Sequence, residues 1–243
     1  MFIEKVYPLN LDRCPQRHWA MMASLHHAYV PFEIIERYAA KDGLHYKKTL
    51  DVVDAMVADG FPEFQAFYDY ESYWQKPKNL CVSWGFLSIL RMVVERHETA
   101  LIIEDDTHLR QASFYRLCDV CKSLPNLEMI YLDSFAWKDA DPDVTRDEYM
   151  VREKEYRQTL KPTQYSYIQS HAYGMGSRAR VFTPDGAQRF LKESLKRPWS
   201  SSENVGWYMR EDGEDMANHY IWYNTDSETR ATFTISDLRF IGE

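Results

Sequence analysis

The chain is poor in the patterns that mark disulfide-bonded, zinc-binding and membrane-spanning proteins. It has four cysteines in 243 residues. Cys118 and Cys121 have CxxC spacing, but no second pair accompanies them, and buried thiols are favoured over a zinc or redox site. No apolar run approaches the roughly 18 residues of a spanning helix, and residues 1–8 lack the apolar segment of a signal peptide. We expect a soluble cytoplasmic protein, in the host cytoplasm for a viral source.

The chain also lacks an excess of positive charge and the common glycine-rich phosphate loops. Its net charge of -8 argues against general nucleic-acid or anionic-membrane binding, and a local basic pocket remains compatible with it. The absence of GxGxxG and GxxxxGK[ST] makes a dinucleotide-dependent dehydrogenase or a P-loop NTPase a poor match. Aromatic residues reach 15%. They suit stacking on sugars or bases, although ordinary packing accounts for most of them.

What the sequence does contain is an alternation of apolar strands and amphipathic helices. Strands are predicted over residues 6–9, 32–38, 99–103 and 127–132. Helices are predicted over residues 15–25, 50–58, 82–96, 114–122, 183–196 and 215–223, and Thr183 is the expected N-cap of the helix that begins at Pro184. This order predicts an α/β fold with a mainly parallel sheet in a single domain, residues 1–243. Residues 138–162 are highly charged and read as a solvated helix or a lid.

The most informative segment is an apolar run that ends in three consecutive carboxylates, Leu101 to Asp106. Adjacent acids repel one another, and a hard divalent cation such as Mg²⁺ or Mn²⁺ is the usual counter-charge for oxygen ligands. Ligands of open α/β sheets gather at the carboxyl ends of the strands. A metal site and a solvated acidic turn are both open at this point.

A second polar segment follows the first predicted strand. Asn10, Arg13 and Arg17 would face the same sheet edge as the acids, and arginines there can pair with a pyrophosphate through bidentate hydrogen bonds. Asp42 and Gly43 form a turn after the second predicted strand. Surface charge at a helix start is the alternative for the arginines.

The order and spacing of these sequence motifs resemble those of glycosyltransferase family 25, the lipooligosaccharide and collagen galactosyltransferase group. Tyr7 to Arg13, with Arg17, is similar to the family's "INLDR…R", and Ala40 to Gly43 to its "A-x-D-G". Leu101 to Asp106 matches "(I/L)xEDD", and Ala172 to Ala187 resembles "AY…S…GA". The match is weak at Trp84 to Ser88, where the family's Cys and His are absent, and over residues 138–162.

The resemblance implies a GT-A type fold, a nucleotide-sugar donor, most simply a UDP-sugar, and a bound Mn²⁺ or Mg²⁺. The donor half would be about residues 1–135 and the acceptor half about 136–243. Asp106 would bind the metal, and Glu104 or Asp105 would complete its shell or contact the ribose. The residues expected to line the donor are Asn10, Leu11, Arg13, Arg17, Asp42, Glu104 and Asp105. The acceptor would be a hydroxyl of a glycan or glycoprotein.

The family is mostly inverting, so a base must take the proton of the acceptor hydroxyl. Asp215 is the first candidate and Asp212 the second, with a capping role for Asp215 as the alternative. His171 and His219 are candidates for a late metal ligand, although a lone histidine is more often structural. Two other function classes compete with the transferase. One is a metal-dependent nucleotidyltransferase or phosphohydrolase, and the other is a non-catalytic carbohydrate-binding relative.

Overall fold

In the computed structural model, the described residues are 1–69, 76–109, 111–132, 158–165, 168–172, 179–198 and 205–222. Their helices are α1 (Pro15–His27), α2 (Thr49–Ala58), α3 (Pro77–Arg96), α4 (Phe114–Ser123), α6 (Pro184–Lys196) and α7 (Val205–Glu211). Short 3-10 helices are η1 (Phe32–Ile34), η2 (Gly43–His45) and η3 (Pro62–Asp69). The strands are β1 (Lys5–Leu11), β2 (Tyr38–Ala40), β3 (Ala100–Glu104), β4 (Met129–Tyr131), β5 (Lys161–Pro162), β6 (Ile168–Ser170), β7 (Ala179–Phe182) and β8 (His219–Trp222).

These strands form one eight-stranded sheet in the order β2-β1-β3-β7-β4-β8-β6-β5. β1 is parallel to β2 and β3, and β4 is parallel to β8. β7 is antiparallel to both β3 and β4, and β6 is antiparallel to both β8 and β5. Six strands of the described sheet therefore point the same way, and β7 and β6 point the other way. The predicted α/β fold with a mainly parallel sheet is confirmed.

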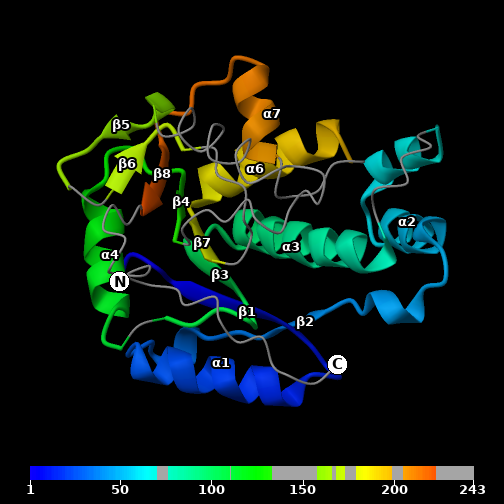
Figure 1. Cartoon of the computed structure of the whole chain (residues 1–243), viewed down its shortest axis with the longest axis horizontal. Coiled ribbons are helices and arrows are strands. Elements are labelled where there is room, and N and C mark those ends of the chain that lie inside the picture. Colours follow the sequence, from blue (N-terminus) through cyan, green and yellow to red (C-terminus); the bar gives the residue numbers. More distant parts are fainter. Residues whose placement is uncertain are drawn as a thin grey trace, which may run out of the picture.

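Helices cover both faces of the sheet, α3 and α6 on one side and α1 and α4 on the other (Figure 1). The alternation of side chains along β3 shows why. Ala100 and Ile102 join the core beneath α2, α3 and α6, whereas Leu101 and Ile103 join the core beneath α1 and α4. A strand apolar on both faces is stable only between two such layers. β3, with its acidic end, is thus buried between two helical layers in the interior of the sheet.

Proline and glycine position the helix starts. Proline lies in the first turn of α1, α3 and α6, where its missing N–H costs no hydrogen bond. The Thr183 hydroxyl accepts the N–H of Gly186 at 3.2 Å, which confirms the predicted N-cap. A Cβ added to Gly186 would lie 2.0 Å from the carbonyl oxygen of Glu128. Glycine therefore allows α6 to pack directly against the chain entering β4.

Two predicted elements were wrong. The strand predicted over residues 32–38 is instead η1 followed by the short strand β2. The helix predicted over residues 215–223 is a turn followed by β8, whose four residues are all buried. A short, fully buried apolar segment does not show by its periodicity whether it is strand or helix. Residues 133–157, which include most of the charged segment, lie outside the described residues.

The prediction of buried thiols is confirmed for the CxxC pair. All four cysteines are free, and Cys118 and Cys121 are buried in α4. Burial raises the pKa of both thiols, so they are poor nucleophiles and poor metal ligands. Among the described helices, none is long and apolar enough to cross a membrane. The cytoplasmic location stays a prediction.

Candidate active site

The carboxyl ends of β2, β1 and β3 lie side by side at one edge of the sheet. Leu11 is in register with Ala40, and Leu9 is in register with Glu104. The loops that follow these three strands therefore meet at this edge, which we call the donor edge. The strand ends, these loops and the start of α1 carry the polar residues that the sequence singled out.

The three carboxylates at the end of β3 form a tight turn in which each has a different environment. The N–H of Thr107 donates to the carbonyl of Glu104 at 3.1 Å and closes the turn. The Asp105 side chain is 9% exposed and points into the protein. Asp106 is partly exposed, and its carboxylate accepts the Thr107 hydroxyl at 3.3 Å. Asp106 is therefore better placed than Asp105 to meet a ligand.

Asp105 is anchored by the end of β1 and the start of α1. Asn10 donates from Nδ2 to one carboxylate oxygen at 2.6 Å, and Arg17 lies 3.2 Å from the other. The N–H of Leu11 also donates to this carboxylate. Burial, together with the charge of Asp106, nevertheless raises the pKa of Asp105 above its usual value. Asp105 thus joins β1, α1 and the acidic turn into one unit.

Arg37, which the sequence analysis missed, holds Asn10 in this orientation. Its guanidinium donates twice to Asn10 Oδ1, at 2.9 and 3.1 Å, and once to the Asn10 carbonyl at 3.3 Å. It also pairs with Asp12 at 2.5 Å. Because Arg37 can only donate, the amide of Asn10 must turn its NH₂ group toward Asp105. The only feature of the sequence that could have indicated this role is the position of Arg37, directly before β2.

Asp42 and Arg13 form the second pair at this edge. Arg13 Nε donates to Asp42 at 2.6 Å, and the other Asp42 oxygen accepts the N–H of Leu44 at 3.0 Å. Burial would raise the pKa of Asp42, but the Leu44 N–H and Arg13 hold it below its usual value. Asp42 is therefore ionised at neutral pH and both caps η2 and binds Arg13.

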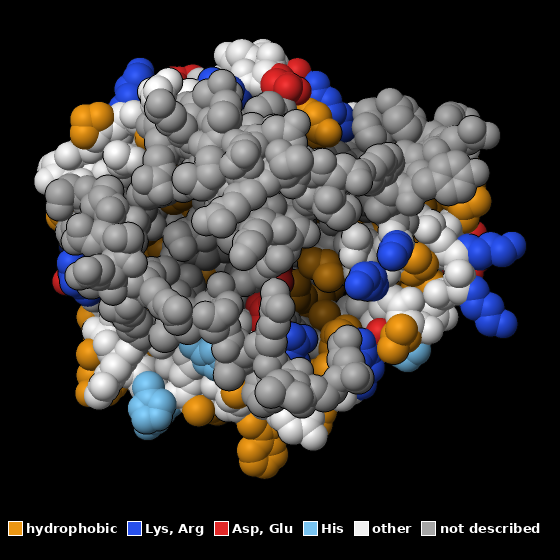
Figure 2. All heavy atoms as spheres, viewed as in Figure 1, with side chains coloured by type: hydrophobic (Ala, Val, Ile, Leu, Met, Phe, Trp, Pro, Cys, Tyr) orange, Lys and Arg blue, Asp and Glu red, His pale blue; other side chains and the backbone are white. Residues whose placement is uncertain are grey.

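Basic side chains gather beside the donor edge. Figure 2 shows them at the end of the molecule where η2, α2 and the start of α3 lie in Figure 1. Lys47, Lys48, Lys76 and Lys78 are exposed, and Gly43 packs so closely on Lys78 that an added Cβ would lie 2.4 Å from its Cα. This contact places the first turn of α3 beside η2, and therefore at the donor edge. The positive potential there would favour the approach of an anionic substrate.

The structure does not bring Asp212 or Asp215 to the donor edge. Both precede β8, which runs in the same direction as β3, so Asp215, just before β8, lies at the opposite edge of the sheet, and Asp212 lies beside the C-terminal end of α6. Asp212 pairs with both terminal nitrogens of Arg197, at 2.9 and 2.6 Å. Asp215 is exposed, and its side chain accepts the N–H of Ala217 at 2.9 Å. Their geometry is that of a surface ion pair and a turn cap.

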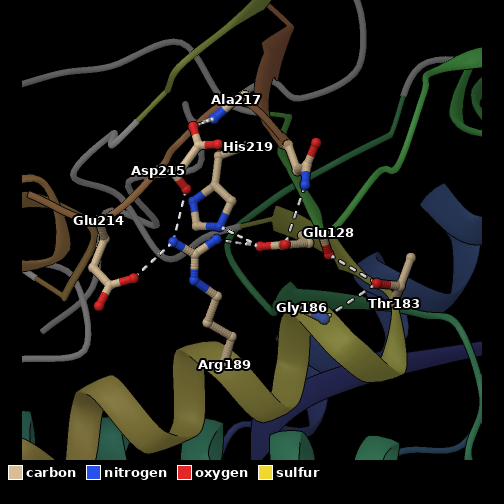
Figure 3. A network of polar contacts seen from close by, with 9 residues as sticks. Glu128, Thr183, Gly186, Arg189, Glu214, Asp215, Ala217 and His219 are labelled. Carbon is tan, nitrogen blue, oxygen red and sulfur yellow. Dashed lines mark hydrogen bonds and ion pairs between the residues drawn. The ribbon is translucent and has the colours of Figure 1, made fainter.

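His219, predicted as a possible late metal ligand, belongs to a polar network at that opposite edge (Figure 3). Its Nε2 lies 3.1 Å from Glu128, which Arg189 also contacts at 2.8 Å. Arg189 continues to Glu214 at 3.1 Å and to the carbonyl of Asp215 at 2.7 Å. The network ties β4, α6 and β8 together. Among the described residues, the hydrogen bonds and ion pairs of this network end at α6, β4 and the turn before β8.

Within the described ranges, no group of three or more His, Cys, Asp or Glu side chains converges on a point where a metal ion could bind. Mg²⁺ sites in enzymes that bind nucleotides are commonly built differently, from one or two carboxylates completed by substrate phosphates and water. The partly exposed Asp106 carboxylate, with Glu104 at the start of the same turn, is compatible with a site of that kind.

Comparisons with known proteins identify a family. A family model described as glycosyltransferase family 25 (LPS biosynthesis protein) matches residues 3–205. Mouse xyloside xylosyltransferase 1, in its apo form, is 12% identical, with a TM-score of 0.42 over 88% of this chain and 77% of that chain. The apo WbbM bifunctional glycosyltransferase is 12% identical, with a TM-score of 0.46 over 91% of this chain and 38% of that chain. No curated protein sequence matches.

The family match contains the whole donor edge and ends before Asp212. It covers far more than half of the chain, in agreement with the resemblance seen in the first loop and the acidic turn. The chain therefore belongs to glycosyltransferase family 25 and is a glycosyltransferase with an α/β fold.

Proposed function

We propose that the protein transfers a sugar from a nucleoside-diphosphate donor, a UDP-sugar, to a hydroxyl of a glycan or glycoprotein with the help of Mn²⁺ or Mg²⁺. The observation that carries this proposal is the acidic turn at the end of β3. Asp105 is fixed there by Asn10 and Arg17, and Asp106 is left partly exposed beside it. This arrangement occurs at the donor edge of a family 25 glycosyltransferase.

Each donor-edge residue has a role in this proposal. Asp106, with Glu104, would hold the metal, which would neutralise charge on the leaving nucleoside diphosphate. Arg13 and Arg17 would supply positive charge near the diphosphate, since each already pairs with a carboxylate at this edge. Asp42 and the backbone of Asn10 and Leu11 would line the nucleoside. Asp105 would act from within the protein, by keeping Asn10 and Arg17 in place.

The proposed reaction inverts the sugar carbon, which requires a base close to the acceptor hydroxyl. Asp215 and Asp212 were the predicted bases. The position of Asp215 at the opposite edge of the sheet, and the partners that Asp212 and Asp215 already have, give this role no support.

The test is calorimetric titration of the full chain with UDP, GDP and CDP, with and without Mn²⁺. We expect one nucleotide to bind in a metal-dependent manner. Asp106→Asn should weaken that binding at least about tenfold, since changing even a group that only supports a metal ligand costs about 10- to 100-fold. Asp119→Asn, which removes an exposed carboxylate from α4, is the matched control.

Two results would contradict the proposal. One is the absence of metal-dependent binding of any nucleoside diphosphate by the wild-type chain. The other is an Asp106→Asn variant that binds as tightly as the Asp119→Asn control. If one nucleoside diphosphate binds in a metal-dependent manner, its release from the corresponding nucleotide sugar is measured next to establish turnover.

A further inference from the structure

A pocket of about 370 Å³ lies away from the donor edge. It is formed by the connection between α4 and β4, the β5–β6 hairpin and the turn that leads into β8. Asn126, His171 and Asn218 lie at the amino-terminal side of β4 and β8, opposite the acidic turn. Its volume falls within the range of about 300–1,000 Å³ that is usual for small-molecule sites.

The lining of this pocket is uncharged. None of the described residues that line it is Asp, Glu, Lys or Arg. Among the described lining residues, two side chains can titrate, the imidazole of His171 and the hydroxyl of Tyr220. Burial and the nearby Lys161 lower the pKa of His171, so its imidazole is neutral at neutral pH. Lys161 and Asp215, which lie near His171 outside the lining, act on its pKa in opposite senses, so neither sign of charge prevails and the pocket fits a neutral ligand.

Several polar side chains of the pocket have hydrogen-bonding capacity to spare. The Ser170 hydroxyl lies 3.0 Å from His171 Nδ1 and orients the ring, which leaves Nε2 without a partner among the described residues. Asn218 donates from Nδ2 to Glu128 at 3.3 Å, which fixes its amide plane. The exposed Asn126 amide makes no side-chain hydrogen bond within the described part of the chain. Such groups can both donate to and accept from hydroxyls.

The remaining wall of the pocket is apolar and rigid. Pro125 and Pro162 lie in it, and the Tyr220 hydroxyl donates to the Pro125 carbonyl at 2.8 Å. A ring-shaped ligand with one C–H face and a rim of hydroxyls matches this combination of an apolar wall and a rim of amides and imidazole. We propose that the pocket binds a neutral sugar residue of a glycan, at a site separate from the donor edge.

Such a site would hold a glycan by a residue distant from the one that reacts, and so raise the effective concentration of the glycan at the enzyme. This consequence for transfer rests on the proposed function, whereas sugar binding by the pocket does not. Binding is therefore measured first in the absence of nucleotide and metal.

The experiment is saturation-transfer difference NMR on the full chain with methyl β-galactoside, methyl α-glucoside and lactose, compared with glucuronate and glucose 6-phosphate. At least one neutral sugar should bind, and more tightly than the charged pair. Asn126 and His171 have left-handed backbone, with φ of 50° and 62°. Glycine fits there without strain, so Asn126→Gly and His171→Gly remove the side chains cleanly. The double variant should weaken binding by about tenfold.

His97→Gly is the matched control, because His97 has φ of 54° at the end of α3, outside the pocket. It should bind the neutral sugar as the wild type does. The proposal is overturned if no neutral sugar binds, if the charged sugars bind more tightly, or if the double variant binds no more weakly than His97→Gly. Sugar binding without metal-dependent nucleotide binding would support the pocket and contradict the proposed transferase chemistry, which keeps the two proposals separable.

Discussion

Replacing Glu128 by glutamine should remove a large, pH-dependent part of the protein's stability. The Glu128 side chain is 18% exposed, and His219, Arg189 and Asn218 all lie within hydrogen-bonding distance of it. Burial alone would raise its pKa, but these partners lower the pKa from 4.5 to about 2. Glutamine keeps the shape of the side chain and cannot ionise, so it tests the charge.

The expected magnitude follows from linkage between proton binding and folding. A folded-state pKa lowered by about 2.5 units is worth about 3 kcal/mol of unfolding free energy when the carboxylate is ionised in both states. Because the folded pKa is below the unfolded one, this stability is fully present above pH 4.5 and is lost as the pH falls through about 2. About 2 kcal/mol should remain at pH 3.5.

Urea denaturation followed by circular dichroism from pH 7 to pH 3.5 provides the measurement. The difference in unfolding free energy between wild type and Glu128→Gln should be about 3 kcal/mol at pH 7 and should narrow toward acid. Burial lowers the pKa of His219, so its protonation on unfolding adds to acid sensitivity in both proteins. Glu95→Gln, at an exposed site on α3, is the control. A difference that stays constant with pH, or a fully stable Glu128→Gln variant, would refute the reasoning.

Two further predictions concern the donor edge and the start of α6. Arg37→Met should free the Asn10 amide and raise the KM for the donor by about tenfold or more, with a smaller effect on kcat. The reason is that a hydrogen bond to a charged group contributes about 1.5–3 kcal/mol. Steady-state kinetics provides the measurement, and an equal rise of KM in an Arg91→Met control would contradict this prediction. Gly186→Ala should lower the unfolding free energy by about 1–3 kcal/mol or more, since its Cβ would overlap the Glu128 carbonyl. Gly213→Ala, in open space at φ +78°, should cost only the strain of a left-handed alanine, and thermal unfolding that ranks the two the other way would refute the packing argument.

The sequence predicted best the elements whose local signals agree with their surroundings. The predicted helix at residues 183–196 and its cap at Thr183 are both present, because the Thr-Pro-Asp start and the apolar period favour the same helix. The strand before Glu104 is also present, because a run of apolar residues can be buried on both faces of a sheet. The segment at residues 215–223 failed because its burial comes from the neighbouring strands β4 and β6, which local periodicity does not reveal.

The features of the candidate site likewise fall into those that the sequence predicts and those that depend on the tertiary structure. By itself, the sequence determined which side chains lie at or just after the ends of β1, β2 and β3. The parallel direction of these strands was enough to bring Asn10, Asp42 and the acidic turn to one edge. Only the tertiary structure decided that Asp105 turns inward to Asn10 and Arg17, that Arg37 orients Asn10, and that the turn before β8 lies at the opposite edge. These outcomes depend on strand order and on contacts between residues far apart in the chain, and such contacts leave no periodic or local trace in the sequence.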